Sequence, residues 1–304
     1  MPARSSSLPP ASEWTGPAPE QEFYQPYTTE EDKEHTNVHY EQPPEFFTTI
    51  TGGRWNVYSC NLWDQDNAAD DTAAQEAKLD MFAEMLGLKA GQRILDVGCG
   101  WGGPLTYLSK TYGVEGVGLT LSPTQKAFAE QRIAREQANV RVIECHWRDY
   151  EDDRPFDAIF TDEVIVHFSD LRGFFAKAHS LLRPGGRFLN KELHFSSSQH
   201  THLSRGDVFL NEIYGLTGNY RMLWEELKFL DETGFELSEV RTMPRRHYQK
   251  QAERWQANMY AAKDRLQELV GAEHYRRFRI YLKLVGKLFA GHQMTIDVVL
   301  STRL

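Results

Sequence analysis

The feature that most constrains this chain is the segment RILDVGCGWGG at residues 93–103. A short apolar run ends at Asp96, and four glycines follow within six residues. Glycine adopts backbone conformations that other residues avoid, and it lets a ligand lie directly against the backbone. The pattern predicts a buried strand, a sharp turn and a helix whose free N–H groups face a ligand. The four glycines are Gly98, Gly100, Gly102 and Gly103.

Two ligand classes use such a loop: dinucleotides and S-adenosylmethionine. A dinucleotide site carries an Asp or Glu for the ribose about 20 residues further on, at the end of the next strand. Here the next apolar segment, residues 114–121, ends in Thr120 and Leu121 without an acid. The spacing is also GxGxG and not GxGxxG. Both observations favour S-adenosylmethionine. A plain strand–helix turn is disfavoured because so many glycines cost conformational entropy.

Composition bounds the remaining possibilities. The chain has 304 residues, 40% hydrophobic and 25% charged, as in ordinary globular proteins. A net charge of −9 argues against a general nucleic-acid binder and against strong attachment to anionic lipid, so we expect no nucleic acid and at most peripheral membrane contact.

Cysteine usage and hydropathy bear on the compartment. Cys60, Cys99 and Cys145 show neither metal-ligand spacing nor a disulfide framework, so we expect no metal site. No apolar run approaches the roughly 20 residues that span a bilayer, and the N-terminus lacks a secretory signal. These features predict a cytoplasmic protein.

Hydrophobic periodicity predicts an α/β fold with a doubly wound, mostly parallel sheet of seven strands. The strands are expected near residues 93–97, 115–120, 140–145, 156–161, 186–193, 235–243 and 294–302. The helices are expected near residues 44–50, 70–88, 103–112, 123–137, 170–183 and 223–230, with a long helical insertion over 245–291. Ligands bind outside the carboxyl ends of such strands, which places residues 98–103, 120–125, 146–149 and 161–167 at one rim.

Domain organisation follows from the same pattern. Residues 1–20 are rich in Pro, Ser and Ala and are predicted to be a disordered tail. Residues 21–304 are predicted to form a single domain. Its expected parts are an N-terminal helical cap (21–90), a cofactor-binding core (91–194), a lid (195–220) and a helical substrate cover (244–292). The apolar stripe of this cover, from Phe278 to Phe289, is expected to be core packing because of its helical spacing.

Several motifs together resemble the cyclopropane fatty acid synthase and mycolic acid methyltransferase family. The similarity runs from about His39 to the C-terminus. Its motifs are HYEQPPEFF, VYSCNLW, LDVGCGWGG, VGLTLSPTQ, HWRDY, VHF and RRHYQKQAERW, in the family's order and with similar spacing. The resemblance implies a Rossmann-like methyltransferase fold and an S-adenosylmethionine-dependent enzyme that alkylates lipid double bonds.

Carried over by position, the resemblance implies a set of cofactor contacts. Trp147 can pack on an adenine face, although large aromatic residues are also often buried for packing alone. Gln125 can bind a polar edge. The implied contacts are Tyr58, Ser59, the loop from Asp96 through Gly98 and Gly100 to Gly102, Thr120, Leu121, Gln125, Trp147 and Arg148.

The family also holds a bicarbonate ion that resembles a general base, with Cys, Glu, His and Tyr as its ligands. Cys60 and Tyr248 match two of these ligands, whereas Val166 and Lys191 stand in place of the Glu and the His. Either a different base acts, or other groups hold the bicarbonate. Close in sequence are Glu163, His167, Glu192 and His194. Glu163 could replace the lost carboxylate or could make a capping or lid contact. For His167 a role as a hydrogen-bonded structural histidine is the preferred alternative.

The predicted catalytic residues are therefore Cys60, Glu163, His167 and Tyr248. The first hypothesis is transfer of a methyl or methylene group to a carbon of an unsaturated lipid-like acceptor. The alternative is a small-molecule N- or C-methyltransferase on the same scaffold, which would need no strong base. A non-catalytic binding protein and a nicotinamide oxidoreductase are further alternatives. The expected partner is a lipid or another apolar small molecule, and an oligomer is compatible with the sequence.

Overall fold

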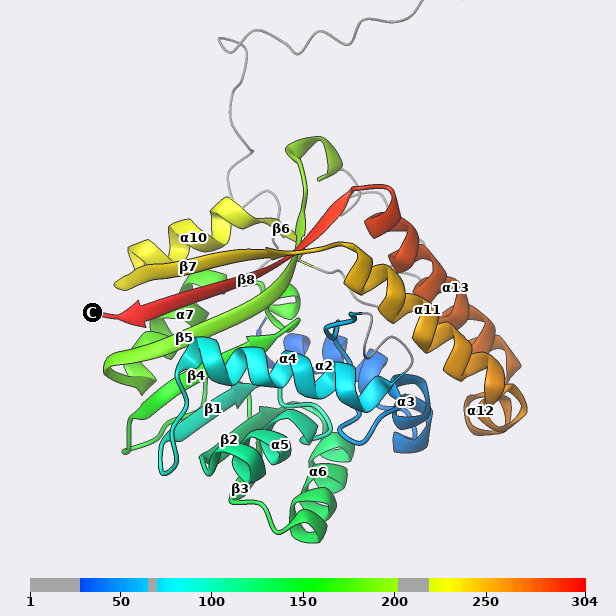
Figure 1. The fold of residues 1–304 in the computed structure, drawn as a ribbon, viewed down its shortest axis with the longest axis horizontal. Helices are drawn as coiled ribbons and strands as arrows, with labels where there is room; N and C mark the ends of the chain where they lie inside the picture. Colours follow the sequence, from blue (N-terminus) through cyan, green and yellow to red (C-terminus); the bar gives the residue numbers. More distant parts are fainter. Residues whose placement is uncertain (1–27, 65–69, 202–218) are drawn as a thin grey trace, which may run out of the picture.

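The computed structural model describes residues 28–64, 70–201 and 219–304 (Figure 1). The predicted tail over residues 1–20 and most of the predicted lid lie outside the described residues. The remaining chain alternates strands and helices in the order expected for an α/β protein.

A twisted sheet organises the structure, with strand order β3-β2-β1-β4-β5-β8-β7. Strand β8 runs antiparallel to both of its neighbours, and the pairs from β3 to β5 are parallel. The strands are β1 (Arg93–Val97), β2 (Glu115–Thr120), β3 (Val140–Glu144), β4 (Phe156–Asp162), β5 (Leu182–Phe195), β7 (Phe235–Met243) and β8 (Met294–Arg303). The doubly wound, mostly parallel sheet is confirmed. A two-residue strand, β6 (Arg221–Met222), pairs with the end of β5 and makes an eighth strand that the sequence did not predict.

Helices cover both faces of this sheet. The helices are α4 (Asp71–Leu86), α5 (Gly103–Tyr112), α6 (Pro123–Glu136), α7 (Leu171–Leu181) and α10 (Leu223–Glu232). Because successive strand residues point to opposite faces, Ile94 of β1 packs in the core with α4 and α5, and Leu95 packs in the core with α7 and α10. This burial on two faces explains why successive residues at the centre of β1 are both apolar and do not alternate with polar ones.

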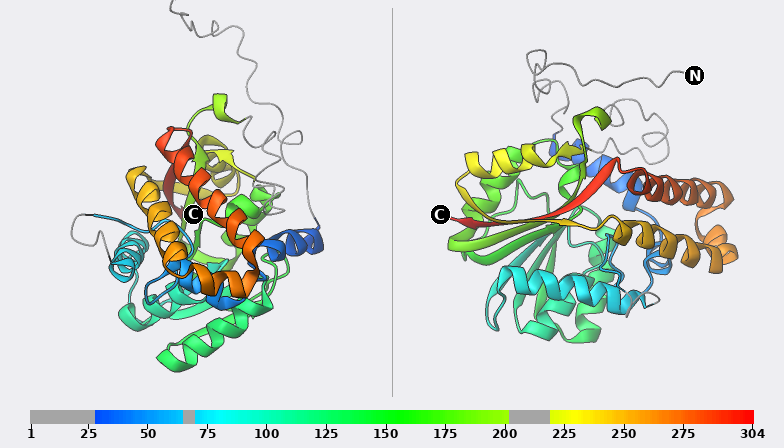
Figure 2. Two further views of the ribbon diagram at one scale, coloured as in Figure 1. Left: turned by 90° about the vertical axis from the view of Figure 1, so that its right-hand side faces the viewer. Right: turned by 45° about the horizontal axis from the view of Figure 1, so that its top comes forward.

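Further helices gather at the end of the sheet opposite the C-terminus (Figures 1 and 2). They are α2 (Thr29–Tyr40), α3 (Pro44–Thr51), α11 (Arg246–Ala261), α12 (Lys263–Val270) and α13 (Ala272–Ala290). The long helical insertion expected over residues 245–291 therefore consists of three helices, α11, α12 and α13. Phe278 and Phe289 of α13 are fully buried, as its helical spacing predicted. Helix α2 was not predicted because it is mostly polar, although Thr28 and Glu31 form the capping box that could have revealed it.

A buried ionic cluster joins α10 to the centre of the sheet. His194 on β5 contacts Asp297 of β8 through Nδ1 at 3.0 Å and Glu226 of α10 through Nε2 at 2.9 Å. Burial opposes the charged imidazole, but hydrogen bonds to Asp297 and Glu226 raise the pKa of His194 to about 9. The imidazolium is thus the cation that lets two carboxylates be buried together.

The first prediction concerns this cluster. His194→Gln leaves two buried carboxylates without a cation and should lower the free energy of unfolding by about 3 kcal/mol. The folded-state pKa is raised above the ordinary 6.5, so the imidazolium stabilises the protein fully below pH 6.5 and this contribution is lost as the pH rises through about 9. Denaturant unfolding across this range should show a falling stability that the variant lacks. Equal slopes in the two proteins would contradict the assignment.

Candidate active site

A cavity opens at the carboxyl ends of β1, β2 and β4, beneath the N-terminal helices. It brings together most of the predicted site residues from five separate segments of the chain. Those that line it are Tyr58, Ser59, Asp96, Gly98, Gly100, Thr120, Leu121, Gln125, Trp147, Glu163 and His167.

The glycine loop forms one wall of the cavity. Gly98 and Gly100 have φ values of 87° and 51°, in the left-handed region that favours glycine. A Cβ atom on Gly100 would meet no atom within 4 Å, so a side chain there would enter the cavity. Gly102 has a different role, since its Cβ would lie 2.7 Å from the Cβ of Ala129 on α6. Gly102 is therefore required for helix packing and is not among the cavity-lining residues.

Asp96 and Gln125 provide polar groups in this wall. Burial and the nearby carboxylate of Asp162 raise the pKa of Asp96 well above its ordinary value. A cationic ligand group beside Asp96 would favour its charged form. Thr120 Oγ1 donates to Gln125 Oε1 at 2.7 Å, and the Ser122 hydroxyl accepts from the Gln125 backbone N–H, so the amide is held in place.

Trp147 and Arg148 differ in their placement. Trp147 lines the cavity and also packs against Phe168 and Phe174, with centroid distances of 5.7 and 5.4 Å. Both of its predicted roles, ligand contact and packing, are therefore compatible with its position. Arg148 is not among the cavity-lining residues. Its guanidinium lies over the Trp147 ring at 4.9 Å and pairs with Asp170, so it packs against the ring.

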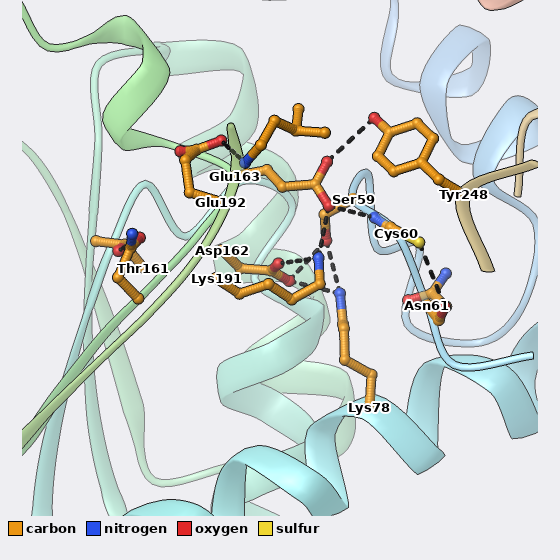
Figure 3. A network of polar contacts seen from close by, with 12 residues as sticks. Ser59, Cys60, Asn61, Lys78, Thr161, Asp162, Glu163, Lys191, Glu192 and Tyr248 are labelled. Atoms are coloured by element: carbon orange, nitrogen blue, oxygen red, sulfur yellow. Dashed lines mark hydrogen bonds and ion pairs between the residues drawn. The ribbon is translucent and has the colours of Figure 1, made fainter. Parts of the chain in front are cut away.

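A chain of buried charges lies beside the cavity (Figure 3). Lys78 Nζ of α4 contacts Asp162 Oδ2 at 2.5 Å, and Lys191 Nζ of β5 contacts Asp162 Oδ1 at 2.9 Å and Glu163 Oε1 at 2.5 Å. All four side chains are less than a tenth exposed. Burial opposes its charge, but Lys191 and Lys78 lower the pKa of Asp162 to about 2. Asp162 and Glu163 likewise raise the pKa of Lys191 against the effect of burial.

Glu163 is held by two of the other predicted catalytic residues. Its Oε1 accepts the Cys60 backbone N–H at 2.7 Å, and its Oε2 accepts the Tyr248 hydroxyl at 3.2 Å. Cys60 thus contributes its backbone, while its thiol lies toward the Asn61 carbonyl oxygen. Burial raises the pKa of the Cys60 thiol, which disfavours the nucleophilic thiolate. Cys60 and Tyr248 do not line the cavity themselves, but both donate hydrogen bonds to Glu163, which does.

The other candidate bases are placed less favourably. Glu192 accepts the backbone N–H groups of Val166 and Leu193, and burial raises its pKa to about 8, which favours the neutral acid. His167 lines the cavity, with Nε2 at 3.4 Å from the Tyr40 hydroxyl oxygen, and burial lowers its pKa to about 4. His194 belongs to the ionic cluster described above.

Sequence reasoning missed Lys78 and Asp162. Lys78 is fully buried, although a lysine is rarely buried without a partner. A signal was available, because Lys78 lies four residues before Phe82 on the apolar face of α4. Asp162 directly precedes Glu163 at the end of β4, where ligands of parallel sheets bind.

Within the described ranges, none of the helices has both the length and the apolar character needed to cross a bilayer. Across those same residues, no cluster of three or more His, Cys, Asp or Glu side chains is arranged to hold a metal ion.

A family model and relatives of known name match most of this chain. The model of the mycolic acid cyclopropane synthetase family matches residues 27–299. Cyclopropane mycolic acid synthase 1 of Mycobacterium tuberculosis (strain H37Rv) is 30% identical over 271 residues, which cover 84% of this chain and 92% of that protein. Cyclopropane-fatty-acyl-phospholipid synthase of Escherichia coli (strain K12) is 39% identical over 150 residues, 48% of this chain and 37% of that protein.

The fold comparison agrees. The crystal structure of mycolic acid cyclopropane synthase CmaA1 complexed with SAH and CTAB superposes with a TM-score of 0.81 at 25% identity, covering 89% of this chain and 98% of that one. The family inferred from the motifs is thereby confirmed: this chain belongs to the mycolic acid cyclopropane synthetase family and has its methyltransferase fold.

Proposed function

We propose that this protein is an S-adenosylmethionine-dependent methyltransferase that transfers a methyl or methylene group to a carbon–carbon double bond of an unsaturated acyl chain. The observation that supports this most is the convergence, in one cavity, of the glycine loop with a buried carboxylate, Glu163. The relatives are named as synthases that act on mycolic acids and on fatty acyl phospholipids, which supports a lipid acceptor.

The residues around the cavity fit the cofactor. S-adenosylmethionine supplies an electrophilic methyl group on a positively charged sulfur. The backbone at Gly100 leaves room for it, and Asp96 on the cavity wall offers a carboxylate to its cationic groups. The adenosine would be contacted by Thr120, Leu121, Gln125 and Trp147. On the side of the covering helices, the cofactor would be contacted by Tyr58 and Ser59. Arg148 acts indirectly by supporting Trp147.

The surroundings also suit the acceptor. When an alkene carbon takes up a methyl group, positive charge develops on the neighbouring carbon. Aromatic faces stabilise such a charge, and Tyr58 lies among rings of Phe47 and Trp255 at centroid distances of 5.0 Å each. The covering helices bury this aromatic cluster and keep water from the cation, which would otherwise be trapped as an alcohol.

A base completes the reaction by taking a proton from the cationic acceptor. Among the candidates, Glu163 combines a position on the cavity wall with hydrogen bonds from Tyr248 and the Cys60 backbone. His167 lies on the same wall, and its proposed role is to position Tyr40 through the contact between its Nε2 and the Tyr40 hydroxyl. A small-molecule N-methyltransferase would need no such base, so the buried carboxylate of Glu163 beside the cavity favours the lipid reaction.

The proposal includes the partner of the protein and its location in the cell. An apolar acyl chain is the partner, and contact with a membrane is at most peripheral because the net charge is −9. Cys60, Cys99 and Cys145 are all free thiols, which fits a reducing cytoplasm.

The second prediction tests the acceptor. Purified protein incubated with methyl-labelled S-adenosylmethionine should transfer label to vesicles of unsaturated phospholipid and not to saturated vesicles of the same head group. Mass spectrometry should show products heavier than the substrate by one methylene unit. Label that appears only in amine-containing small molecules, with none in either lipid, would favour the N-methyltransferase alternative.

The third prediction tests the cofactor site. Gly100→Val places a side chain in the cavity and should weaken S-adenosylmethionine binding at least ~100-fold, equivalent to about 2.7 kcal/mol. Gly91→Val is the matched control, since Gly91 also has a positive φ and open space around it but lies outside the cavity lining. Calorimetric titration measures both affinities. A Gly100→Val affinity equal to that of the control would refute the site.

A further inference from the structure

The carboxylate of Glu163 is bound by three donors from three separate elements (Figure 3). Oε1 receives the Cys60 backbone N–H at 2.7 Å and lies 2.5 Å from the ammonium of Lys191 on β5. Oε2 receives the hydroxyl of Tyr248 on α11 at 3.2 Å. Hydrogen bonds and an ion pair from fixed elements are what a buried anion requires. The site is therefore built to hold one carboxylate group, and that group is part of the chain.

A separate bicarbonate does not fit beside this carboxylate. The resemblance places such an ion between the residues that match Cys60 and Tyr248. The Cys60 N–H and the Tyr248 hydroxyl each have one hydrogen, and both donate to Glu163. A bicarbonate there would lose these two donors and would face a second negative charge in a buried site. Both effects oppose its binding.

The charge balance of the cluster leads to the same conclusion. Two ammonium groups, Lys78 and Lys191, face two carboxylates, Asp162 and Glu163, and all four are buried. An added anion would leave an uncompensated negative charge. Removal of Glu163 would instead leave an uncompensated positive charge, which a small anion from solution could neutralise.

The two departures from the family pattern, at Val166 and Lys191, are both consistent with a carboxylate supplied by the chain. Where the family has a glutamate ligand this chain has Val166, whose side chain brings no second carboxylate and whose backbone N–H is bonded to Glu192. Where the family has a histidine this chain has Lys191, which contacts Glu163 directly. One change removes a negative charge and the other supplies a cation for a carboxylate attached to the chain.

The backbone at Glu163 has an unusual conformation. Its φ is 59°, in the left-handed region, which costs a non-glycine residue on the order of 1 kcal/mol or more. Its N–H donates to the Lys191 carbonyl oxygen at 2.7 Å. The conformation turns the chain at the end of β4 toward the cover. It also means that glycine can replace Glu163 without backbone strain.

We propose that Glu163 is the tethered base of this enzyme, that it takes the place of a diffusible bicarbonate, and that Lys191 is its positioning residue. This inference rests on the proposed function. The acceptor's π electrons form the bond to the incoming methyl carbon, and the electron pair of the broken S–C bond stays on sulfur. A proton then passes to a Glu163 oxygen, either from the new methyl, whose carbon is two bonds from the cationic carbon, or from a carbon bonded directly to the cationic carbon. The released C–H pair closes a cyclopropane if the proton leaves the new methyl, or forms a double bond otherwise.

A carboxylate is basic enough for this step. A carbocation loses an adjacent proton to weak bases, so the position of the base and its charge matter more than its strength. The protonated Glu163 returns its proton to water when the product leaves, and the enzyme is restored without a co-reactant.

The fourth prediction separates a tethered base from a bound ion. In buffer freed of carbon dioxide, wild-type turnover should be unchanged, and added bicarbonate should not increase it. Glu163→Gln should cut turnover ~100-fold or more, because the amide fills the space but takes no proton. Glu163→Gly should be equally slow in this buffer and should regain activity as bicarbonate or acetate is added, because the donors are then exposed.

Matched variants control for folding and for the role of Lys191. Gln137→Gly makes the same change at another left-handed position, with φ of 54° at the end of α6, and should behave as wild type. Lys191→Met combined with Glu163→Gly should abolish rescue by bicarbonate, whereas Lys191→Arg with Glu163→Gly should retain part of it. A merely structural lysine would not change the dependence on bicarbonate.

A binding measurement gives a readout that is independent of turnover. Carbon-13 bicarbonate should show saturable binding by NMR to Glu163→Gly and none to the wild type, and both proteins should bind S-adenosylmethionine equally by calorimetry. Bicarbonate-dependent wild-type turnover, saturable bicarbonate binding by the wild type, or full activity of Glu163→Gln would each overturn the inference. If the wild type alkylates no lipid, the proposed function fails, and the bicarbonate binding comparison still decides between a filled site and an open one.

Discussion

The buried ion pairs among Lys78, Asp162, Lys191 and Glu163 are the interaction on which the rest of the site depends (Figure 3). Taking four charges out of water is costly, and only their mutual attraction with good hydrogen-bond geometry offsets that cost. The cluster therefore requires α4, β4 and β5 to meet in one arrangement. Loss of any member would leave a buried charge without a partner, so the cluster is sensitive to substitution even where a residue does not touch a ligand.

The same charges place the covering segments over the sheet. Asp162 accepts the Ser59 hydroxyl at 2.6 Å, and Glu163 accepts from Cys60 and from Tyr248 of α11. The polar contacts thus hold the segment after α3 and the start of the C-terminal helices against the carboxyl ends of the strands. Aromatic packing closes the outer part, with Tyr248 stacked on Phe289 at a centroid distance of 4.1 Å. A covered cavity and a charged wall consequently arise from one set of contacts.

Local sequence signals were sufficient for the seven longer strands and the glycine loop, and the predicted bounds of β1 and β2 match the structure. They failed where structure depends on distant partners. Helix α2 has no apolar stripe, and the cover breaks into three helices at positions that helical spacing alone does not mark. Lys78 and Asp162 are 84 residues apart in sequence, so their pairing could not be read from a motif. Arg148 was assigned to the cofactor from the resemblance of HWRDY to the family's motif, and in the structure its guanidinium lies over the Trp147 ring and is not among the cavity-lining residues.

The most direct test of the central claim is a crystal structure of the protein with S-adenosylhomocysteine and an unsaturated acyl analogue, grown in the presence of bicarbonate. The account predicts continuous density for Glu163 between the Cys60 nitrogen and the Tyr248 hydroxyl, with the acyl double bond on its open side and no separate anion. A bicarbonate held by Cys60 and Tyr248, with the Glu163 side chain turned away, would contradict it.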